Sequence, residues 1–125
     1  MEVTGYDVNK LSELGLDLEE GIEYCAGDPD LFEEMIEEFI RDCGVKKEKV
    51  EEAFKAQDRE EYRTLVHALK GTSRTIGLTE LSGMFFELEK AASVGQTDYI
   101  NENHAKVMDE CEKTIRGLQA AKCES

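Results

Sequence analysis

Apolar residues recur at helical spacing along almost the whole of this chain. The longest run begins at Asp28-Pro29, where an aspartate can cap a helix and a proline suits its first position. From there the apolar residues keep a helical period over roughly seven turns, with Gly44 as a candidate bend. They are Phe32, Met35, Ile36, Phe39, Ile40, Cys43, Val50 and Phe54. This pattern predicts one long amphipathic helix.

Three more amphipathic runs follow, each bounded by residues that suit a helix end. Asp58 can cap the first run, Gly77 fits a left-handed position at its end, and Gly95 ends the second run. Their apolar positions are Tyr62, Leu65, Leu69 and Ile76, then Leu78, Leu81, Phe85, Leu88 and Ala92, and finally Ile100, His104, Val107, Cys111, Ile115 and Leu118. Two shorter amphipathic pieces, residues 7–14 and 17–27, precede all four long runs.

Four long amphipathic helices with short connections specify an all-α fold, an up-and-down antiparallel four-helix bundle. We expect the two short N-terminal helices to cover one end of this bundle. No strand pattern competes with the helical one. A chain of 125 residues fits one compact domain. We therefore expect a single domain over residues 1–125, with a core that spans about 15–120.

The chain is strongly acidic, because 29 Asp and Glu residues against 15 Lys and Arg residues give a net charge of −14. Such a field repels nucleic acids and anionic membranes, so we expect neither as a partner. No apolar run approaches the length of a membrane span, and the N-terminus lacks the regions of a signal peptide. We expect a cytoplasmic protein that acts as a monomer.

The four cysteines have none of the spacings of a metal knuckle, and each lies within a helical pattern. They are Cys25, Cys43, Cys111 and Cys123. We interpret them as reduced thiols. A structural zinc site or a disulfide is the alternative.

The chemically distinctive residues gather on the helix that starts at Asp58. At about 100° per residue, its apolar stripe lies opposite His67, so we expect His67 to face water. The side of the helix that carries His67 also carries Arg63, Lys70, Gly71 and Arg74. No Asp or Glu occurs between Tyr62 and Thr79. A basic stripe around a histidine, in so acidic a chain, predicts a local anion-attracting surface.

Gly71 is unusual inside a helix, where glycine costs about 1 kcal/mol relative to alanine. Helical side chains lean toward the N-terminus, so a side chain at position 71 would lean over His67. Glycine would leave the imidazole open to a bulky partner, although close packing against another helix is an alternative explanation. Lys70 supplies a cation one turn from the ring that could stabilise phosphate. We interpret Ser73 as a small residue that allows close helix approach.

These residues match a known family pattern. His67-x-Leu69-Lys70-Gly71-x-Ser73-x-x-x-Gly77 resembles the signature of histidine-containing phosphotransfer (HPt) domains, the intermediates of two-component phosphorelays. The flanks agree as well, over roughly residues 15–120. Gly27-Asp28-Pro29-Asp30-Leu31 with Phe39, Asp58, and Leu88-Glu89 with Ala91-Ala92 are similar to the family's corresponding segments.

The resemblance implies that His67 is phosphorylated on a ring nitrogen, Nε2, and that Lys70 and Gly71 have the family's roles. It also implies partners: response-regulator receiver domains, and a hybrid sensor histidine kinase as a further candidate. Glu89 is similar in position to a glutamate that bonds the histidine ring in the phosphotransfer domains of chemotaxis kinases. A carboxylate there would accept Nδ1–H and leave Nε2 as the nucleophile. An ordinary rim glutamate is the equally weighted alternative.

We expect the partner-binding surface to include Arg63, Gly71, Arg74 and Phe86, with Ser73 and Gly77 as structural support. Phe86 shares the edge of Glu89, and a rim or core position is equally plausible for it. The sequence has no phosphate-binding glycine loop or kinase signature, so we expect no autonomous kinase or phosphatase activity. No cofactor is expected on this chain, and the receiver would bring the Mg²⁺ for phosphoryl transfer.

The resemblance implies a carrier that bears a phosphoryl group on His67 between receiver domains, or between a kinase and a receiver. Three other functions compete with this one. The first is an adaptor bundle that binds receivers without being phosphorylated, and the second is an excised domain of a hybrid sensor kinase. Met1 and the polar ends favour a stand-alone chain over that second alternative. The third is a metal-binding bundle, which lacks the required Glu three residues before either His67 or His104. We expect His104 to be a packed bundle residue rather than a second phosphorylation site.

Overall fold

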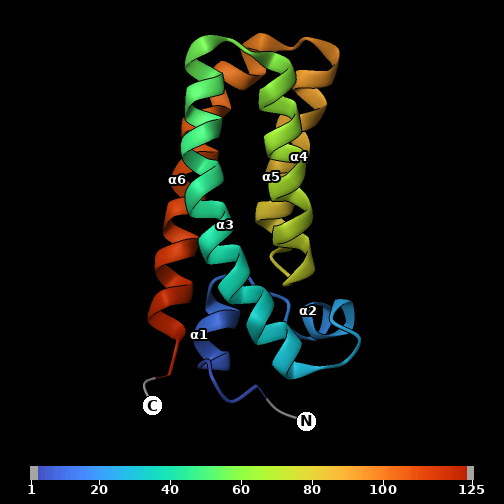
Figure 1. The fold of residues 1–125 in the computed structure, drawn as a ribbon, viewed down its shortest axis with the longest axis vertical. Helices are drawn as coiled ribbons and strands as arrows, with labels where there is room; N and C mark the ends of the chain where they lie inside the picture. The colour runs from blue at the N-terminus through green and yellow to red at the C-terminus, as the bar shows by residue number, and fades with distance from the viewer. Residues whose placement is uncertain (1–2, 124–125) are drawn as a thin grey trace.

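Residues 3–123 are described by a computed structural model, and they form six helices with one isolated β-bridge, between Tyr6 and Lys122. The helices are α1 (Val8–Glu13), α2 (Leu18–Tyr24), α3 (Pro29–Ala56), α4 (Arg59–Thr75), α5 (Thr79–Val94) and α6 (Thr97–Ala121). Figure 1 shows α3 to α6 as four long helices side by side, with α1 and α2 at the lower end. Each long helix packs against its neighbours, α3 on α4, α4 on α5, α5 on α6 and α6 on α3. The predicted all-α bundle is confirmed.

The residues expected to start the helices do so. Asp28 Oδ1 accepts a hydrogen bond from the Asp30 amide at 3.0 Å, and Pro29 is the first residue of α3. Asp58 Oδ1 accepts from the Glu61 amide at 3.1 Å, so it caps α4. These carboxylates satisfy amides that have no partner within the helix. The α3 helix is one continuous helix that includes Gly44, the candidate position for a bend.

Two helix ends differ from the sequence-based expectation. α2 ends at Tyr24 rather than at Gly27, because Ala26 and Gly27 both have positive φ, 58° and 76°. α4 ends at Thr75, and Ile76 lies just beyond it as a fully buried cap residue. Gly77 then adopts φ +84°, the left-handed conformation that its position predicted.

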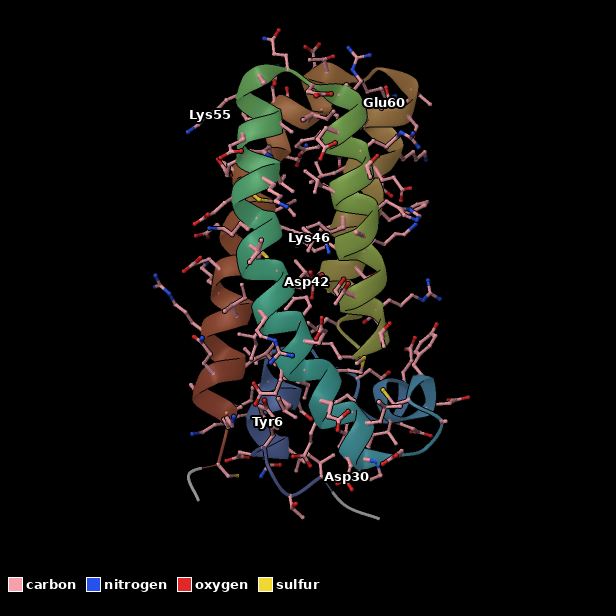
Figure 2. The ribbon with its side chains drawn as sticks, in the orientation of Figure 1. Tyr6, Asp30, Asp42, Lys46, Lys55 and Glu60 are labelled. Atoms are coloured by element: carbon pink, nitrogen blue, oxygen red, sulfur yellow. The ribbon has the colours of Figure 1, made fainter. Side chains whose placement is uncertain are left out.

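The lower end of the bundle ties the two ends of the described chain together. The Tyr6 hydroxyl donates to Glu37 Oε1 at 2.8 Å, and Lys122 Nζ lies 2.6 Å from the same oxygen. Figure 2 shows Tyr6 at this end, and Lys55 and Glu60 at the opposite end near the α3–α4 connection. None of the helices within residues 3–123 is long and apolar enough to cross a membrane.

The four cysteines are free thiols. Cys25, Cys43 and Cys111 are buried, and Cys123 is exposed. A hydrogen bond with Cys111, together with burial, raises the pKa of the Cys43 thiol. The side chains of Cys43 and Cys111 therefore lie in contact inside the bundle.

His104 is packed inside the bundle, as its position in the apolar row predicted. Its ring is 3% exposed and stacks on Phe54 with centroids 3.9 Å apart. Nδ1 lies 2.9 Å from the Tyr62 hydroxyl, and Nε2 lies 2.9 Å from Glu51 Oε1. An ionised Glu51 can only accept, so Nε2 donates to it and Nδ1 accepts from Tyr62. Both ring nitrogens are therefore engaged by neighbours in the neutral state.

The burial of His104 predicts that the free energy of unfolding depends on pH. Burial lowers the pKa of His104, and this effect outweighs the opposing attraction of Glu51. The unfolded chain should then bind the proton more tightly than the folded chain, starting near the ordinary pKa of about 6.5. We expect the free energy of unfolding to fall by up to about 1 kcal/mol between about pH 7.5 and 5.5, measured by urea denaturation. The His104→Gln variant should show a shallower dependence, and an equal slope in both proteins would contradict this assignment.

Candidate functional site

His67 lies in the middle of α4 with its side chain 62% exposed. Leu65, Val66 and Leu69 on the same helix are buried against the bundle. This packing fixes the rotation of α4 about its own axis. The face of the helix that carries His67 therefore points to solvent. The histidine therefore stands on a rigid helix rather than on a loop.

Glu89, from the neighbouring helix α5, holds the imidazole. Its Oε2 lies 2.6 Å from His67 Nδ1, and its side chain is only 16% exposed. Burial alone would raise the pKa of Glu89, but hydrogen bonds from Lys70 and His67 outweigh it and hold that pKa below its usual value. An ionised carboxylate can only accept, so Nδ1 carries the proton and donates. In this tautomer the lone pair lies on Nε2, and no hydrogen bond within residues 3–123 engages Nε2.

Lys70 binds the other oxygen of the same carboxylate. Its Nζ lies 2.8 Å from Glu89 Oε1, and its side chain is 25% exposed. The same ammonium is 5.5 Å from the centre of the Phe86 ring. Lys70 is therefore engaged with Glu89, a contact that the sequence did not reveal, and it is not the lone solvated lysine that was the alternative. The carboxylate bridges the histidine and the lysine, and both contacts restrict its rotation.

The approach to His67 is open at Gly71. Gly71 is exposed, and a Cβ placed on it would meet no atom of another helix within 4 Å in the described part of the chain. The alternative of close helix packing at this glycine is therefore wrong. Arg63 is also exposed, and Phe86 is 48% exposed at the edge of α5. The structure places all these residues on the face that carries His67, formed by α4 and α5.

Arg74 is exposed on α4, and Tyr24 from α2 contacts it. Arg74 Nε donates to the Tyr24 hydroxyl at 2.8 Å, and the guanidinium lies 5.9 Å from the centre of the ring. Tyr24 is itself 50% exposed. Sequence reasoning missed Tyr24, because its helix is far from α4 along the chain and no spacing links the two.

Ser73 and Gly77 lie below the exposed face and support it. The Ser73 hydroxyl is buried and donates to the Leu69 carbonyl oxygen at 2.7 Å. The Ser82 hydroxyl on α5 donates to the Lys70 carbonyl oxygen at 3.1 Å, a link between the two helices that the sequence did not reveal. Gly77 accepts a hydrogen bond from the Asp17 amide at 2.7 Å. These contacts join α4 to α5 and to the segment that enters α2.

A family model described as the Hpt domain matches residues 34–121 of the chain. The chain belongs to the Hpt domain family. The match runs from within α3 to the end of α6, so it includes His67, Lys70 and Glu89 but leaves out α1 and α2. Neither the curated proteins nor the solved structures gave a match.

Membership of this family indicates the class of reaction in which such domains take part. Hpt domains take part in histidine phosphotransfer in phosphorelays, where they interact with response regulators and kinases. The Hpt domain described here presents an exposed imidazole, a carboxylate that fixes one ring nitrogen, and an ammonium beside it. Phosphoryl transfer requires positioning and charge neutralisation more than covalent work by the protein.

The contact between Glu89 and His67 leads to a mutational prediction for this Hpt domain. Glu89→Gln removes the negative charge that stabilises Nδ1–H, so Nε2 should lose nucleophilic character. We expect phosphorylation of His67 by phosphoramidate to slow by about 10–100-fold, measured by intact mass against time. Nitrogen NMR of the ring should show a more mixed tautomer in this variant. The matched control is Glu87→Gln, an exposed glutamate on the same helix, and an equal loss in both variants would refute the role of Glu89.

Proposed function

We propose that this chain carries a phosphoryl group on Nε2 of His67 between phosphorelay partners. The observation that carries the proposal is the exposed imidazole whose Nδ1 is held by Glu89 at 2.6 Å, while Nε2 has no hydrogen-bond partner within residues 3–123. A fixed tautomer with an accessible Nε2 is what a reversible nitrogen nucleophile requires. The proposed partners are receiver domains, and a sensor kinase that supplies the phosphoryl group at one end of the relay.

The proposed transfer starts from an aspartyl phosphate on a receiver. The Nε2 lone pair attacks phosphorus, the bond from phosphorus to the aspartate oxygen breaks, and the aspartate leaves as a carboxylate. The ring gains positive charge as the N–P bond forms, and Glu89 stabilises that charge through its hydrogen bond with Nδ1–H. Transfer onward runs in reverse, with a second receiver's aspartate attacking phosphorus and the neutral imidazole leaving.

Lys70 has two parts in the proposal. It holds Glu89 in the observed orientation before transfer, and it places a positive charge one turn from the ring that receives the phosphoryl dianion. The Mg²⁺ for the reaction is expected on the receiver rather than on this chain. The proposed setting is the cytoplasm, with the chain acting as a monomer that forms transient complexes.

A two-step relay tests this proposal. The wild-type chain is phosphorylated by phosphoramidate, freed of the reagent, and mixed with receiver domains and Mg²⁺. We expect loss of the phosphoryl group from the chain and its appearance on a receiver, followed by gel electrophoresis with a phosphate stain. Addition of EDTA should block the second step only. A chain that binds receivers but never takes up a phosphoryl group would support the adaptor instead.

A further inference from the structure

The Ser82 hydroxyl on α5 makes its hydrogen bond to another helix. It donates to the Lys70 carbonyl oxygen of α4 at 3.1 Å, and Ser82 is only 5% exposed. Six other helical serines and threonines in the described part of the chain donate instead to the carbonyl oxygen four residues earlier in their own helix, a common bond for such a hydroxyl. They are Thr64, Thr72, Ser73, Thr75, Ser93 and Thr114. Ser82 therefore links two helices, whereas these six bond within one.

The Lys70 carbonyl oxygen accepts from Ser82 although a second hydroxyl lies near it. Ser73 Oγ is 3.0 Å from this oxygen, but it is 2.7 Å from the Leu69 carbonyl oxygen. A hydroxyl has one proton to donate, so Ser73 donates along its shorter contact. Ser73 and Ser82 are both small and buried, and small side chains at a contact allow two helices to approach closely.

The contact of Ser82 determines where Glu89 meets α4. Glu89 follows Ser82 by seven residues, about two turns, so both side chains lie on the same side of α5. Within residues 3–123, α4 and α5 share three side-chain hydrogen bonds, one from Ser82 and the two that Glu89 makes with His67 and Lys70. The bonds of Glu89 end on side chains that can rotate, whereas Ser82 bonds a backbone atom through a short side chain. Ser82 therefore restricts the position of one helix relative to the other most directly.

A small displacement of α5 along its axis would change the histidine site. One residue of an α-helix rises by about 1.5 Å. Apolar packing between the helices has no preferred direction, but a hydrogen bond has one. The Glu89 side chain would have to absorb such a shift, although its two oxygens already contact His67 at 2.6 Å and Lys70 at 2.8 Å. Because hydrogen bonds weaken steeply with misalignment, the tautomer of His67 depends on this offset.

We propose that Ser82 is a positioning residue for phosphoryl transfer. Its bond to the α4 backbone holds α5 at the offset where Glu89 Oε2 meets Nδ1–H of His67, so that Nε2 keeps the lone pair. Ser82 acts through Glu89 and takes no part in bond making or breaking. This inference rests on the proposed function, because it takes Nε2 as the nucleophile.

Ser82→Ala removes the hydroxyl and tests this role. The variant should fold, because the Lys70 carbonyl oxygen still accepts the amide four residues later in α4 and is not left unsatisfied. Ser82→Thr keeps a hydroxyl, and the hollow of about 400 Å³ that Ser82 lines offers space for the added methyl group. Ser93→Ala is the matched control, because Ser93 is on the same helix but its hydroxyl donates to the Glu89 carbonyl oxygen within α5.

Two measurements follow the effect from the ring to the reaction. Nitrogen NMR of the His67 ring, at a pH where the ring is neutral, should show a more mixed tautomer in Ser82→Ala, with Ser82→Thr and Ser93→Ala close to wild type. The rate of labelling by phosphoramidate should fall about fivefold in Ser82→Ala, the factor expected for the loss of one neutral hydrogen bond. In a Glu89→Gln background, Ser82→Ala should change that rate by less than about twofold, since Ser82 acts through Glu89.

Two results would overturn the proposal. One is a Ser82→Ala variant, with its folding verified by circular dichroism, that keeps the wild-type tautomer. The other is an equal loss of rate with and without Glu89, which would show an effect that does not pass through this carboxylate. The tautomer measurement needs no phosphoryl transfer, so it decides the role of Ser82 even where phosphoramidate fails to label the wild-type chain, the result that would refute the proposed function.

Discussion

The His67→Gln variant is expected to neither accept nor donate a phosphoryl group. Glutamine keeps the size and polarity of the side chain but has no basic nitrogen to attack phosphorus. No residual transfer is expected, because the proposed reaction forms its only covalent bond at Nε2 of this ring. The measurement is phosphoryl exchange with a phosphorylated receiver, followed over time with the wild-type chain alongside.

The other histidine supplies the control for this prediction. His104 is 3% exposed, and both of its ring nitrogens are bonded to Tyr62 and Glu51. The His104→Gln variant should therefore still exchange phosphoryl groups, provided that the experiment is run at a pH and temperature where it is folded. Exchange by His67→Gln, or its loss only in His104→Gln, would show that the reactive residue has been misassigned.

Gly77→Ala is expected to lower the free energy of unfolding by about 3 kcal/mol. Gly77 has φ +84°, a left-handed conformation that costs an alanine roughly 1–2 kcal/mol. An added Cβ would also overlap the carbonyl group of Asp17, and such overpacking typically costs about 1–3 kcal/mol more. The backbone there cannot retreat freely, because the Asp17 amide donates to the Gly77 carbonyl oxygen at 2.7 Å.

Urea denaturation of the variant and the wild type measures this loss. The matched control is Gly44→Ala, an exposed position inside α3 where, among residues 3–123, a Cβ would meet no atom of another helix within 4 Å. Alanine there should stabilise the protein by about 0.5–1 kcal/mol, since glycine is a poor helix former. A loss of stability at Gly77 no larger than 1 kcal/mol would mean that the connection between α4 and α5 adapts to a side chain.

The helices and their faces were predictable because they depend on local sequence. Asp28 and Asp58 start helices where a side-chain cap and an apolar period coincide. The exposure of His67 followed from the burial of residues such as Leu65 and Leu69 on the opposite side. The end of α2 was not predicted, because Ala26 adopts a positive φ that alanine rarely takes and no sequence signal marks it.

Contacts between helices were harder to predict than the faces of single helices. A helical wheel put Glu89 at an edge but left open whether it contacts His67, because the contact depends on the rotation and offset of α5 against α4. The structure brings Glu89 within 2.6 Å of the ring and adds Lys70 to the same carboxylate. The contact between Tyr24 and Arg74 depends further on where the short helix α2 docks. Periodicity carries no information about that position.

The most direct test of the central claim is the intact mass of the wild-type chain after treatment with phosphoramidate, followed by peptide mapping at neutral pH. We predict one added phosphoryl group, lost on acid treatment, and located at His67. A folded chain that gains no phosphoryl group, or gains one at any other residue, would contradict the assignment of His67 as the phosphoryl carrier.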